Sequence, residues 1–493
     1  MTIDLLCKVV DNFGDIGVAY RLAKALSDLD STLALRLHVD DLRAFHALCP
    51  EVDPECEAQL VRGWTVLRWN ADWAGLAERP PRVVLECFAC GRPERFEEIL
   101  YDSADPEPRY VVNIEHLTAE SWAADFHLLP SATRSGLVKK WMFMPGFSEG
   151  TGGLIIDRRF REARQAALAA EGRSGGREEL RARLAEELAA RGAIFAGTGE
   201  APAGGESGGE SGRSAESGAE SGRSAESGGE SGRSGESVAE SGRSGESGAE
   251  SGGVARSSVV RSGGRTAEAA AAGLRDRARC RNCDRDRDRD LARDLARRRW
   301  VSVFSYEQDF GRVVEDLAAA DRERPLAVLA AAGRSRACFL AAWESAGRPF
   351  PLLELPFLPQ EIWDEVLLAS DFSIVRGEES LARAALSGRP FLWHAYLQDE
   401  RHQLVKVRAL LDRLRPYFGA ADGAGDGPDF GPVEEAFLAF NDRERDEPGA
   451  GGRERISPLL DARAAEPFRA FAEDLVARGD LAAHLMTFLG EIG

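Results

Sequence analysis

A long stretch of low sequence complexity in the middle of the chain constrains its fold more than any other feature. Between residues 197 and 253 nearly every residue is Gly, Ser, Glu, Ala or Arg, and the tetrapeptide Glu-Ser-Gly-Arg begins at positions 210, 220, 230 and 240. A ten-residue repeat without large apolar side chains cannot build a solenoid core, so we expect a disordered spacer. The 493 residues exceed one ordinary core, and we predict two ordered parts around this spacer.

Both flanking parts alternate apolar runs of strand length with helix-like segments. Continuous apolar runs between helices are typical of buried parallel strands, so the predicted fold class is α/β. A Glu/Arg/Ala-rich segment at 157–193, broken near Gly172–Gly176, and the amphipathic stretch at 468–489 are predicted to be helical. The predicted strands lie at Ile3–Val10, Pro81–Phe88, Tyr110–Ile114, Trp300–Glu307, Pro325–Ala331, Pro351–Leu358, Phe372–Arg376 and Arg389–Trp393.

The charge and hydropathy pattern excludes several classes of function. The net charge of -19 argues against general nucleic-acid binding. The run Arg285–Asp290 alternates in sign, which is poorly suited to follow a phosphate backbone. No apolar run reaches the length of a membrane span, and the N-terminus lacks a signal-peptide pattern. We therefore expect a cytoplasmic protein without nucleic-acid or membrane partners.

The cysteines do not predict a metal site. Eight cysteines in a chain of this length are typical of reduced thiols rather than of a disulfide framework. The pairs Cys87/Cys90 and Cys280/Cys283 would supply four zinc ligands. However, they are nearly two hundred residues apart, far beyond the usual spacing of a zinc ribbon.

A glycine-containing turn near the N-terminus carries the first candidate site. The segment Val9–Gly17 follows an apolar run and leads into a helix-like segment, so Asp11 and Asp15 are predicted at a strand-to-helix turn. In open α/β sheets, ligands bind at the carboxyl ends of the strands, and helix-start amides can receive an anion. The two carboxylates fit either catalysis or the capping of a helix, and the local pattern alone leaves both interpretations open.

The segment Arg376-Gly377-Glu378-Glu379-Ser380 repeats the strand-turn-helix pattern in the second part. Arg376 and the helix-start amides near Ser380 can bind phosphate, and a carboxylate can accept hydrogen bonds from sugar hydroxyls. Phe304, Tyr306, Phe357, Gln360 and Trp363 offer aromatic surface and an amide for a nucleobase. Aromatic residues beside strands are more often core residues, and the two glutamates equally fit a solvated helix start.

Taken together, these motifs resemble those of the bacterial EarP family. They occur in order over about 1–195 and 300–493, and their combination is specific although each alone is weak. Members of that family transfer rhamnose from dTDP-β-L-rhamnose onto one arginine of translation elongation factor P (EF-P). The matching motifs are Asp11–Gly17, Asn113–Trp122, Met144–Phe147, Gly152–Leu154, Phe304–Glu307, Pro356–Gln360, Arg376–Ser380 and Trp393–Tyr396.

The resemblance implies a GT-B glycosyltransferase, in which two Rossmann-like domains face each other across a cleft. The implied reaction inverts the anomeric carbon and needs no metal or other cofactor. Its partners are the donor dTDP-β-L-rhamnose and the protein acceptor EF-P. The implied parts are an acceptor domain at 1–155, a helical connection at 156–196, the disordered insertion at 197–298, a nucleotide-sugar domain at 299–465, and a helix at 466–493 that packs back toward the first domain.

The same resemblance implies roles for single residues. Asp15 is the candidate general base, Asp11 orients the acceptor arginine, and Glu378 completes the predicted catalytic set. A carboxylate pair suits this acceptor, because a guanidinium is a poor nucleophile that carboxylates can hold and deprotonate. The predicted donor site comprises Asn12, Phe13, Gly14, Phe304, Tyr306, Phe357, Gln360, Trp363, Arg376, Glu378, Glu379 and Ser380.

Two features depart from the family pattern. Glu379 stands where the family has Asp, and its extra methylene shifts the carboxylate. The family normally lacks the interruption at 197–298. We expect it between the two domains, where a long insertion is tolerated because loop closure costs little more as length grows. The alternative functions are a non-catalytic GT-B-like binding protein, and a glycosyltransferase or epimerase that acts on a small-molecule acceptor.

Overall fold

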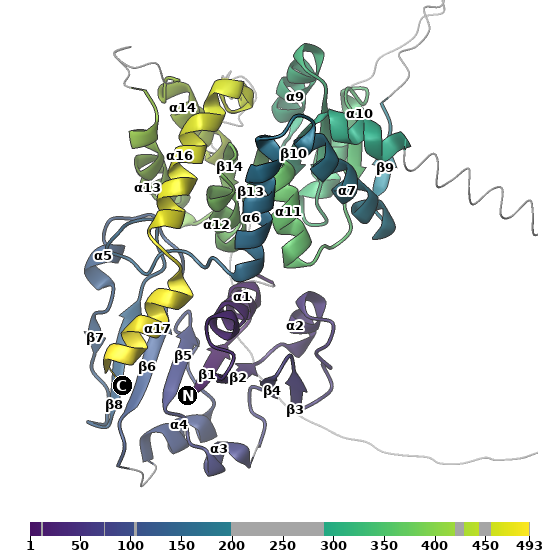
Figure 1. Cartoon of the computed structure of the whole chain (residues 1–493). Coiled ribbons are helices and arrows are strands. Elements are labelled where there is room, and N and C mark those ends of the chain that lie inside the picture. Colours follow the sequence, from purple (N-terminus) through teal and green to yellow (C-terminus); the bar gives the residue numbers. More distant parts are fainter. Residues whose placement is uncertain are drawn as a thin grey trace, which may run out of the picture. The chain divides into compact units, whose positions relative to one another are not determined.

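The structure is a computed structural model that describes residues 1–10, 13–72, 74–102, 106–198, 290–419, 428–442 and 455–492. These residues form two sheets with helices between the strands (Figure 1), which confirms the predicted α/β class. Asp11, Asn12 and residues 199–289 of the disordered insertion predicted at 197–298 lie outside the described residues. Within the described part of the chain, no helix is both long and apolar enough to cross a bilayer.

The first sheet has the strand order β3-β4-β2-β1-β5-β6-β8-β7. Its six inner strands are parallel, whereas β3 and β7 at the two edges are antiparallel to their neighbours. The central strands β1 and β5 are buried almost throughout, as expected for parallel strands covered by helices. The strands are β1 (Thr2–Cys7), β2 (Ala34–Val39), β3 (Ala58–Val61), β4 (Trp64–Arg68), β5 (Val83–Cys87), β6 (Arg109–Ile114), β7 (Pro130–Ser131) and β8 (Val138–Phe143).

The helices of this first half follow the strands in the alternation that parallel pairing requires. Helix α1 directly follows β1 and packs its apolar face into the core below the sheet. Its start therefore lies at the carboxyl end of a central strand. The helices are α1 (Gly14–Leu29), α2 (Leu42–Leu48), α3 (Gly75–Glu78), α4 (Glu94–Asp102) and α5 (Ala123–Phe126).

The second sheet has the order β14-β13-β10-β11-β12-β9, and only β9 at its edge is antiparallel to its neighbour. All five predicted strands of this half are present, although several are shorter than expected. The strands are β9 (Ile194–Ala196), β10 (Arg299–Val303), β11 (Leu326–Ala330), β12 (Leu352–Glu354), β13 (Phe372–Arg376) and β14 (Phe391–His394).

Helices cover this second sheet and bury the large cluster of apolar side chains around its strands. Residues 290–297 are also helical, so the predicted disordered insertion at 197–298 is wrong at its C-terminal end, where Ala292 and Leu295 are buried in an apolar cluster. The helices of this half are α6 (Arg158–Glu171), α7 (Gly176–Ala190), α9 (Gly311–Glu323), α10 (Ser335–Ser345), α11 (Gln360–Ala369), α12 (Glu378–Ser387), α13 (His402–Leu414), α14 (Gly431–Asn441), α15 (Ser457–Leu460) and α16 (Ala465–Ala477), with short 3-10 turns η1 (Asp399–Arg401), η2 (Arg415–Tyr417) and η4 (Ala462–Ala464). The last helix, α17 (Leu481–Ile492), packs instead in the core of the first sheet.

The interruption does not fall between the two halves, contrary to the expectation from the sequence. Strand β9, just before it, pairs with β12, and α7 packs beside α11. Leu188 of α7 and Leu295, just after the interruption, share one apolar cluster with Trp300 of β10. Both flanks therefore belong to the second half. Strand β9 has only three residues and lies beside the low-complexity stretch, so the sequence did not reveal it. The segment 156–196, predicted to be helical, therefore ends in a strand.

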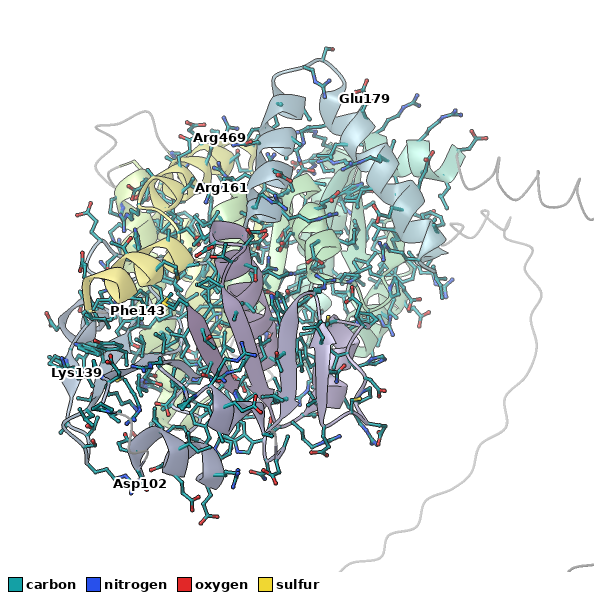
Figure 2. The ribbon with its side chains drawn as sticks, turned by 60° about the horizontal axis from the view of Figure 1, so that its bottom comes forward. Asp102, Lys139, Phe143, Arg161, Glu179 and Arg469 are labelled. Carbon is teal, nitrogen blue, oxygen red and sulfur yellow. The ribbon has the colours of Figure 1, made fainter. Side chains whose placement is uncertain are left out.

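The segment predicted as one helix at 468–489 is two helices. Gly479 interrupts it with φ +101°, and Asp480 accepts a hydrogen bond from the Ile156 amide at 2.7 Å. Helix α17 then lies beside the first sheet (Figure 1), with Leu485 fully buried in that core. Figure 2 shows Phe143 of β8 near α17, and its ring lies 6.4 Å from that of Phe488.

Candidate active site

Asp15 lies at the carboxyl end of β1, on the first turn of α1, as the sequence predicts. Its carboxylate is 7% exposed, and its Oδ2 accepts a hydrogen bond from the Val10 amide at 2.8 Å. Phe13 occupies the position before the helix and caps it with no side-chain hydrogen bond. Asp15 thus stabilises the turn from within the helix, while its partner in the prediction, Asp11, lies outside the described residues.

Glu378, the first residue of α12, reaches the loop that follows β6 in the first half. Its Oε2 accepts a hydrogen bond from the Leu117 amide at 2.9 Å and lies 3.2 Å from Nδ1 of His116. The hydrogen bond to Glu378 raises the pKa of His116 against the opposing effect of burial, and the charge of Asp15 acts in the same direction. The structure therefore brings Asp15, His116 and Glu378 into one electrostatic neighbourhood.

A strained turn after β5 supports His116. Phe88 and Ala89 have φ values of +60° and +48°, a region that residues with a side chain rarely occupy. The Ala89 amide donates to Oδ1 of Asn113 at 2.8 Å, and the Phe88 ring stacks on His116 at 4.3 Å between centroids. Strain of this kind persists where neighbouring contacts enforce it, and it gathers at functional sites.

Sequence reasoning assigned no role to Phe88 or His116. Their positions could have indicated a role, because Phe88 directly follows β5 and His116 lies two residues after the end of β6. The carboxyl ends of neighbouring parallel strands meet at one edge of the sheet. His116 also falls within the Asn113–Trp122 motif that carried part of the family resemblance.

Aromatic rings and one guanidinium gather at the carboxyl ends of the strands in the second half. Arg376, which ends β13, lies 4.7 Å from the ring centre of Phe304 and 4.8 Å from that of Tyr306. Trp363 of α11 contacts Phe304 at 5.7 Å, and His394 contacts Tyr306 at 5.2 Å. Four of the predicted donor-site residues therefore form a single cluster. The indole N–H of Trp363 is buried and has no hydrogen-bond partner among the described residues.

The turn between β13 and α12 depends on glycine. Gly377 has φ +71° and ψ 169°, a combination that only glycine adopts readily. Gly377 alone separates Arg376, the last residue of β13, from the start of α12. Ser380 is buried in the first turn of that helix. Arg376 and the amides of a helix start are thereby adjacent, which is the arrangement that favours an anionic group.

Phe13 and Phe357 connect the predicted donor residues of the two halves. Their ring centres are 5.1 Å apart, and the Phe357 side chain is 48% exposed. Gln360 serves another contact: its Nε2 donates to the carbonyl of Gly17 at 2.9 Å, and its Oε1 accepts from Lys24 at 3.1 Å. The amide expected to orient a nucleobase thus binds helix α1.

Glu379 is likewise turned toward α1 instead of joining the aromatic cluster. Its Oε1 accepts a hydrogen bond from Nε of Arg21 at 2.6 Å. Its neighbour Glu378 contacts the 115–118 loop, so the two adjacent glutamates have different partners. The local pattern did not distinguish them.

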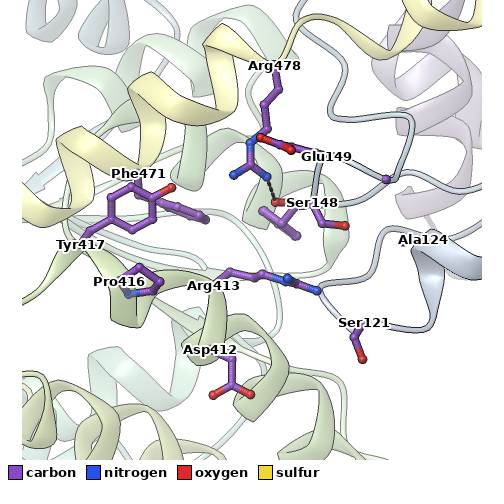
Figure 3. A pocket seen from close by; sticks show the side chains of 12 residues that line it. Ser121, Ala124, Ser148, Glu149, Asp412, Arg413, Pro416, Tyr417, Phe471 and Arg478 are labelled. Atoms are coloured by element: carbon purple, nitrogen blue, oxygen red, sulfur yellow. Dashed lines mark hydrogen bonds between the residues drawn. The ribbon is translucent and has the colours of Figure 1, made fainter.

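A separate pocket of 470 Å³ lies elsewhere in the fold. Figure 3 shows Arg413 and Arg478 among its lining side chains, together with Tyr417 and Phe471. Arg413 donates through Nε to the carbonyl of Ala119 at 3.0 Å. The residues that line this pocket do not include Asp15, Glu378 or Arg376. Its lining carries both acidic and basic side chains and indicates no class of ligand, so the candidate site is the one at the strand ends.

The described residues hold no group of three or more His, Cys, Asp or Glu side chains that could bind a metal ion. Burial raises the pKa of the Cys90 thiol to about 12, and burial also raises that of Cys87. Cys280 and Cys283 lie outside the described residues.

Comparison with known proteins identifies similar sequences. A family model described as elongation factor P (EF-P) rhamnosyltransferase EarP matches residues 3–197 and 250–490. A protein-arginine rhamnosyltransferase of Pseudomonas putida is 29% identical over 425 residues, which cover 84% of this chain and 81% of the relative. One of Pseudomonas aeruginosa is 28% identical over 419 residues, which cover 83% and 80%.

A solved structure also aligns with the chain. It is described as the structural basis for EarP-mediated arginine glycosylation of translation elongation factor EF-P, and it is similar with a TM-score of 0.47 and 20% identity over 99% of both chains. The family model carries the greater weight, because it matches most of the chain on both sides of residues 198–249.

Proposed function

The chain belongs to the EarP family of EF-P rhamnosyltransferases, and from this premise we propose how its residues carry out the transfer. The family membership confirms the predicted resemblance and makes the chain a protein-arginine rhamnosyltransferase of EF-P. It also sets aside the non-catalytic alternative. Two Rossmann-like sheets are the GT-B arrangement that the resemblance implied. Because EF-P is a translation factor, we place the reaction in the cytoplasm.

We propose Asp15 as the general base that accepts the proton of the acceptor arginine. A guanidinium nitrogen attacks the anomeric carbon of rhamnose, the carbon–nitrogen bond forms, and the bond to the diphosphate breaks. The proton released from the nitrogen passes to the Asp15 carboxylate. Its nearly complete burial supports this role, since a carboxylate held in a strand-end turn is oriented and shielded from water. Asp11 would hold the guanidinium beside it.

We propose that the donor dTDP-β-L-rhamnose binds at the aromatic cluster of the second half. The Arg376 guanidinium and the first amides of α12 offer positive charge to the diphosphate as it leaves. Phe304, Tyr306 and Trp363 provide the aromatic surface for the nucleobase. Glu378, at the start of the same helix, would accept hydrogen bonds from the sugar. The attack from the opposite side inverts the anomeric carbon.

A single observation carries the proposal: Glu378 of the donor half contacts His116 of the acceptor half, which also senses the charge of Asp15. The test uses the variant Asp15→Asn with dTDP-β-L-rhamnose and EF-P. We expect transfer to fall about 100- to 10,000-fold, the usual contribution of a general base. Mass spectrometry of EF-P measures the added deoxyhexose, and calorimetry measures donor affinity, which should be retained.

A matched control comes from the same helix. Asp28 lies near the far end of α1, and Asp28→Asn should leave the transfer rate within about twofold of the original. Unchanged transfer by Asp15→Asn would exclude Asp15 as the base. Absence of the mass increase with the unaltered chain, an active donor and cognate EF-P would contradict the function itself.

A further inference from the structure

A buried cluster of charges joins the first half to the second. The guanidinium of Arg21 on α1 is 1% exposed and contacts three carboxylates. It lies 2.7 Å from Asp157, 2.8 Å from Asp364 and 2.6 Å from Glu379. Asp157 caps α6, Asp364 belongs to α11, and Glu379 belongs to α12. One side chain of the first half thus binds three elements of the second.

A second buried arginine completes the cluster. Arg383 lies one turn after Glu379 on α12, 3.8 Å from its carboxylate, and its guanidinium covers the ring of Phe160 at 4.6 Å. Two guanidinium groups and three carboxylates therefore share one site, in which Glu379 is the partly exposed member, at 19%. Removing a single partner leaves an uncompensated charge, so such a site holds its members in one arrangement more than it adds stability.

Two carboxylates of the cluster, Asp364 and Asp157, have pKa values shifted in opposite directions. Burial raises the pKa of Asp364 to about 6, although Arg21 and Arg383 oppose the shift. Burial also acts to raise the pKa of Asp157, but the charges of Arg21 and Arg383 outweigh it and lower that pKa to about 2. Asp157 therefore stays ionised, and Glu379 is the partner that directly follows Glu378 in the chain.

The two helices that meet in this cluster also carry the proposed reacting carboxylates. Asp15 lies six residues before Arg21 on α1, about 9 Å along a rigid helix. Glu378 directly precedes Glu379 at the start of α12. A shift of Arg21 relative to Glu379 would therefore change the placement of Asp15 relative to the donor. Misplacement of reacting groups by about 1 Å can cost a hundredfold in rate.

We propose that Arg21 and Glu379 are positioning residues for rhamnosyl transfer, and that Glu379 acts through Arg21 instead of binding the donor. This inference rests on the proposed function, because it requires that Asp15 is the general base and that the donor binds in the second half. Glu379 is the residue at which this chain has the longer carboxylate. In the structure, that carboxylate accepts a hydrogen bond from Nε of Arg21 at 2.6 Å.

The test separates positioning from donor binding by comparing Glu379→Gln and Arg21→Lys with the unaltered enzyme. We expect kcat to fall about 10- to 100-fold in each, while the donor Kd measured by calorimetry changes less than twofold. Glu379→Asp keeps the charge and should recover most of the kcat lost in Glu379→Gln. A weakened donor Kd with unchanged kcat at saturating donor would overturn the inference and return Glu379 to the donor site.

The matched control is Arg158→Gln. Arg158 pairs with Asp28 at 3.7 Å and also joins α6 to α1, but its side chain is 72% exposed. We expect its kcat to be unchanged, and an equal loss there would also overturn the inference. Circular dichroism shows whether each variant folds. If Glu379→Gln does not fold, the kcat and Kd of Glu379→Asp and Arg21→Lys decide. An unaltered enzyme that forms no rhamnosylated EF-P would instead refute the proposed function.

Discussion

At the scale of single residues, the two adjacent glutamates at the start of α12 have different partners. Successive residues of a helix point about 100° apart. Glu378 therefore reaches the loop after β6, whereas Glu379 reaches Arg21 on α1. The first contact is partly exposed, and the second belongs to a buried cluster. One helix start thus contributes both to the candidate site and to the contact between the two halves.

His116 provides a direct measure of the Glu378 contact. Its pKa should lie above the ordinary 6.5 because Glu378 accepts its hydrogen bond, and Glu378→Gln should lower it toward 6.5. The folded state then binds this proton more tightly than the unfolded state. The stabilisation is complete below pH 6.5 and is lost as the pH rises through the raised value. The effect on stability is small, because the side chain is 55% exposed.

The titration is followed by NMR of the imidazole protons. A His116 pKa that does not respond to Glu378→Gln would show that the contact is absent in solution.

The sequence allowed the clustering of several candidate-site residues to be predicted, but not every partner of these residues. Arg376, Phe304, Tyr306 and Trp363 gather as expected, because strand ends of a parallel sheet converge. Gln360 and Glu379 instead contact α1, more than 340 residues away along the chain. Local pattern contains no information about such a distant partner, so their contacts could not be predicted.

At the scale of elements, α17 completes the core of the first half. Leu485 is fully buried between this helix and the first sheet. Leu485→Ala should lower the free energy of unfolding by about 2–5 kcal/mol, because it removes buried methyl groups and leaves a cavity. Thr487→Ala on the exposed side of the same helix should change it by less than about 0.5 kcal/mol.

Urea denaturation followed by fluorescence measures both variants. The fluorescence of Trp141 reports on the first half, since its ring contacts that of Phe488 of α17 at 5.6 Å. Equal stability of Leu485→Ala and Thr487→Ala would show that α17 does not pack on the sheet as described.

Continuous apolar runs were predicted more reliably than strands that carry charged side chains, such as β2 and β8. Phe372–Arg376 is a strand over the predicted residues, because an apolar run of that length between helical segments has few other interpretations. The short β7 and β9 gave no signal above their surroundings. The break before α17 depends on Gly479 and on a contact of Asp480 with Ile156, and only the glycine is visible in the sequence.

At the scale of the whole molecule, the low-complexity stretch interrupts one half and does not link two. Its flanks, β9 and the helix at 290–297, both pack in the second half. The family model matches 3–197 and resumes at 250. Deletion of residues 200–249 should therefore leave the rate of EF-P rhamnosylation within about twofold, since shortening a loop changes its closure cost only slightly.

Mass spectrometry of EF-P over time measures this rate for the full chain and for the deleted chain. A substitution of the same fifty residues by a Gly/Ser segment of equal length serves as the control for length. Loss of transfer in both chains would show that these residues take part in the reaction or in EF-P binding.

The packing of α17 on the first sheet has a consequence for synthesis on the ribosome. Leu481 is translated about 340 residues after Phe143, yet both belong to one core. At roughly 5–20 residues per second, the first half waits on the order of 20–70 s for the helix that covers it. During that interval its apolar surface is open to chaperones. The half that emerges first is therefore among the last to finish folding.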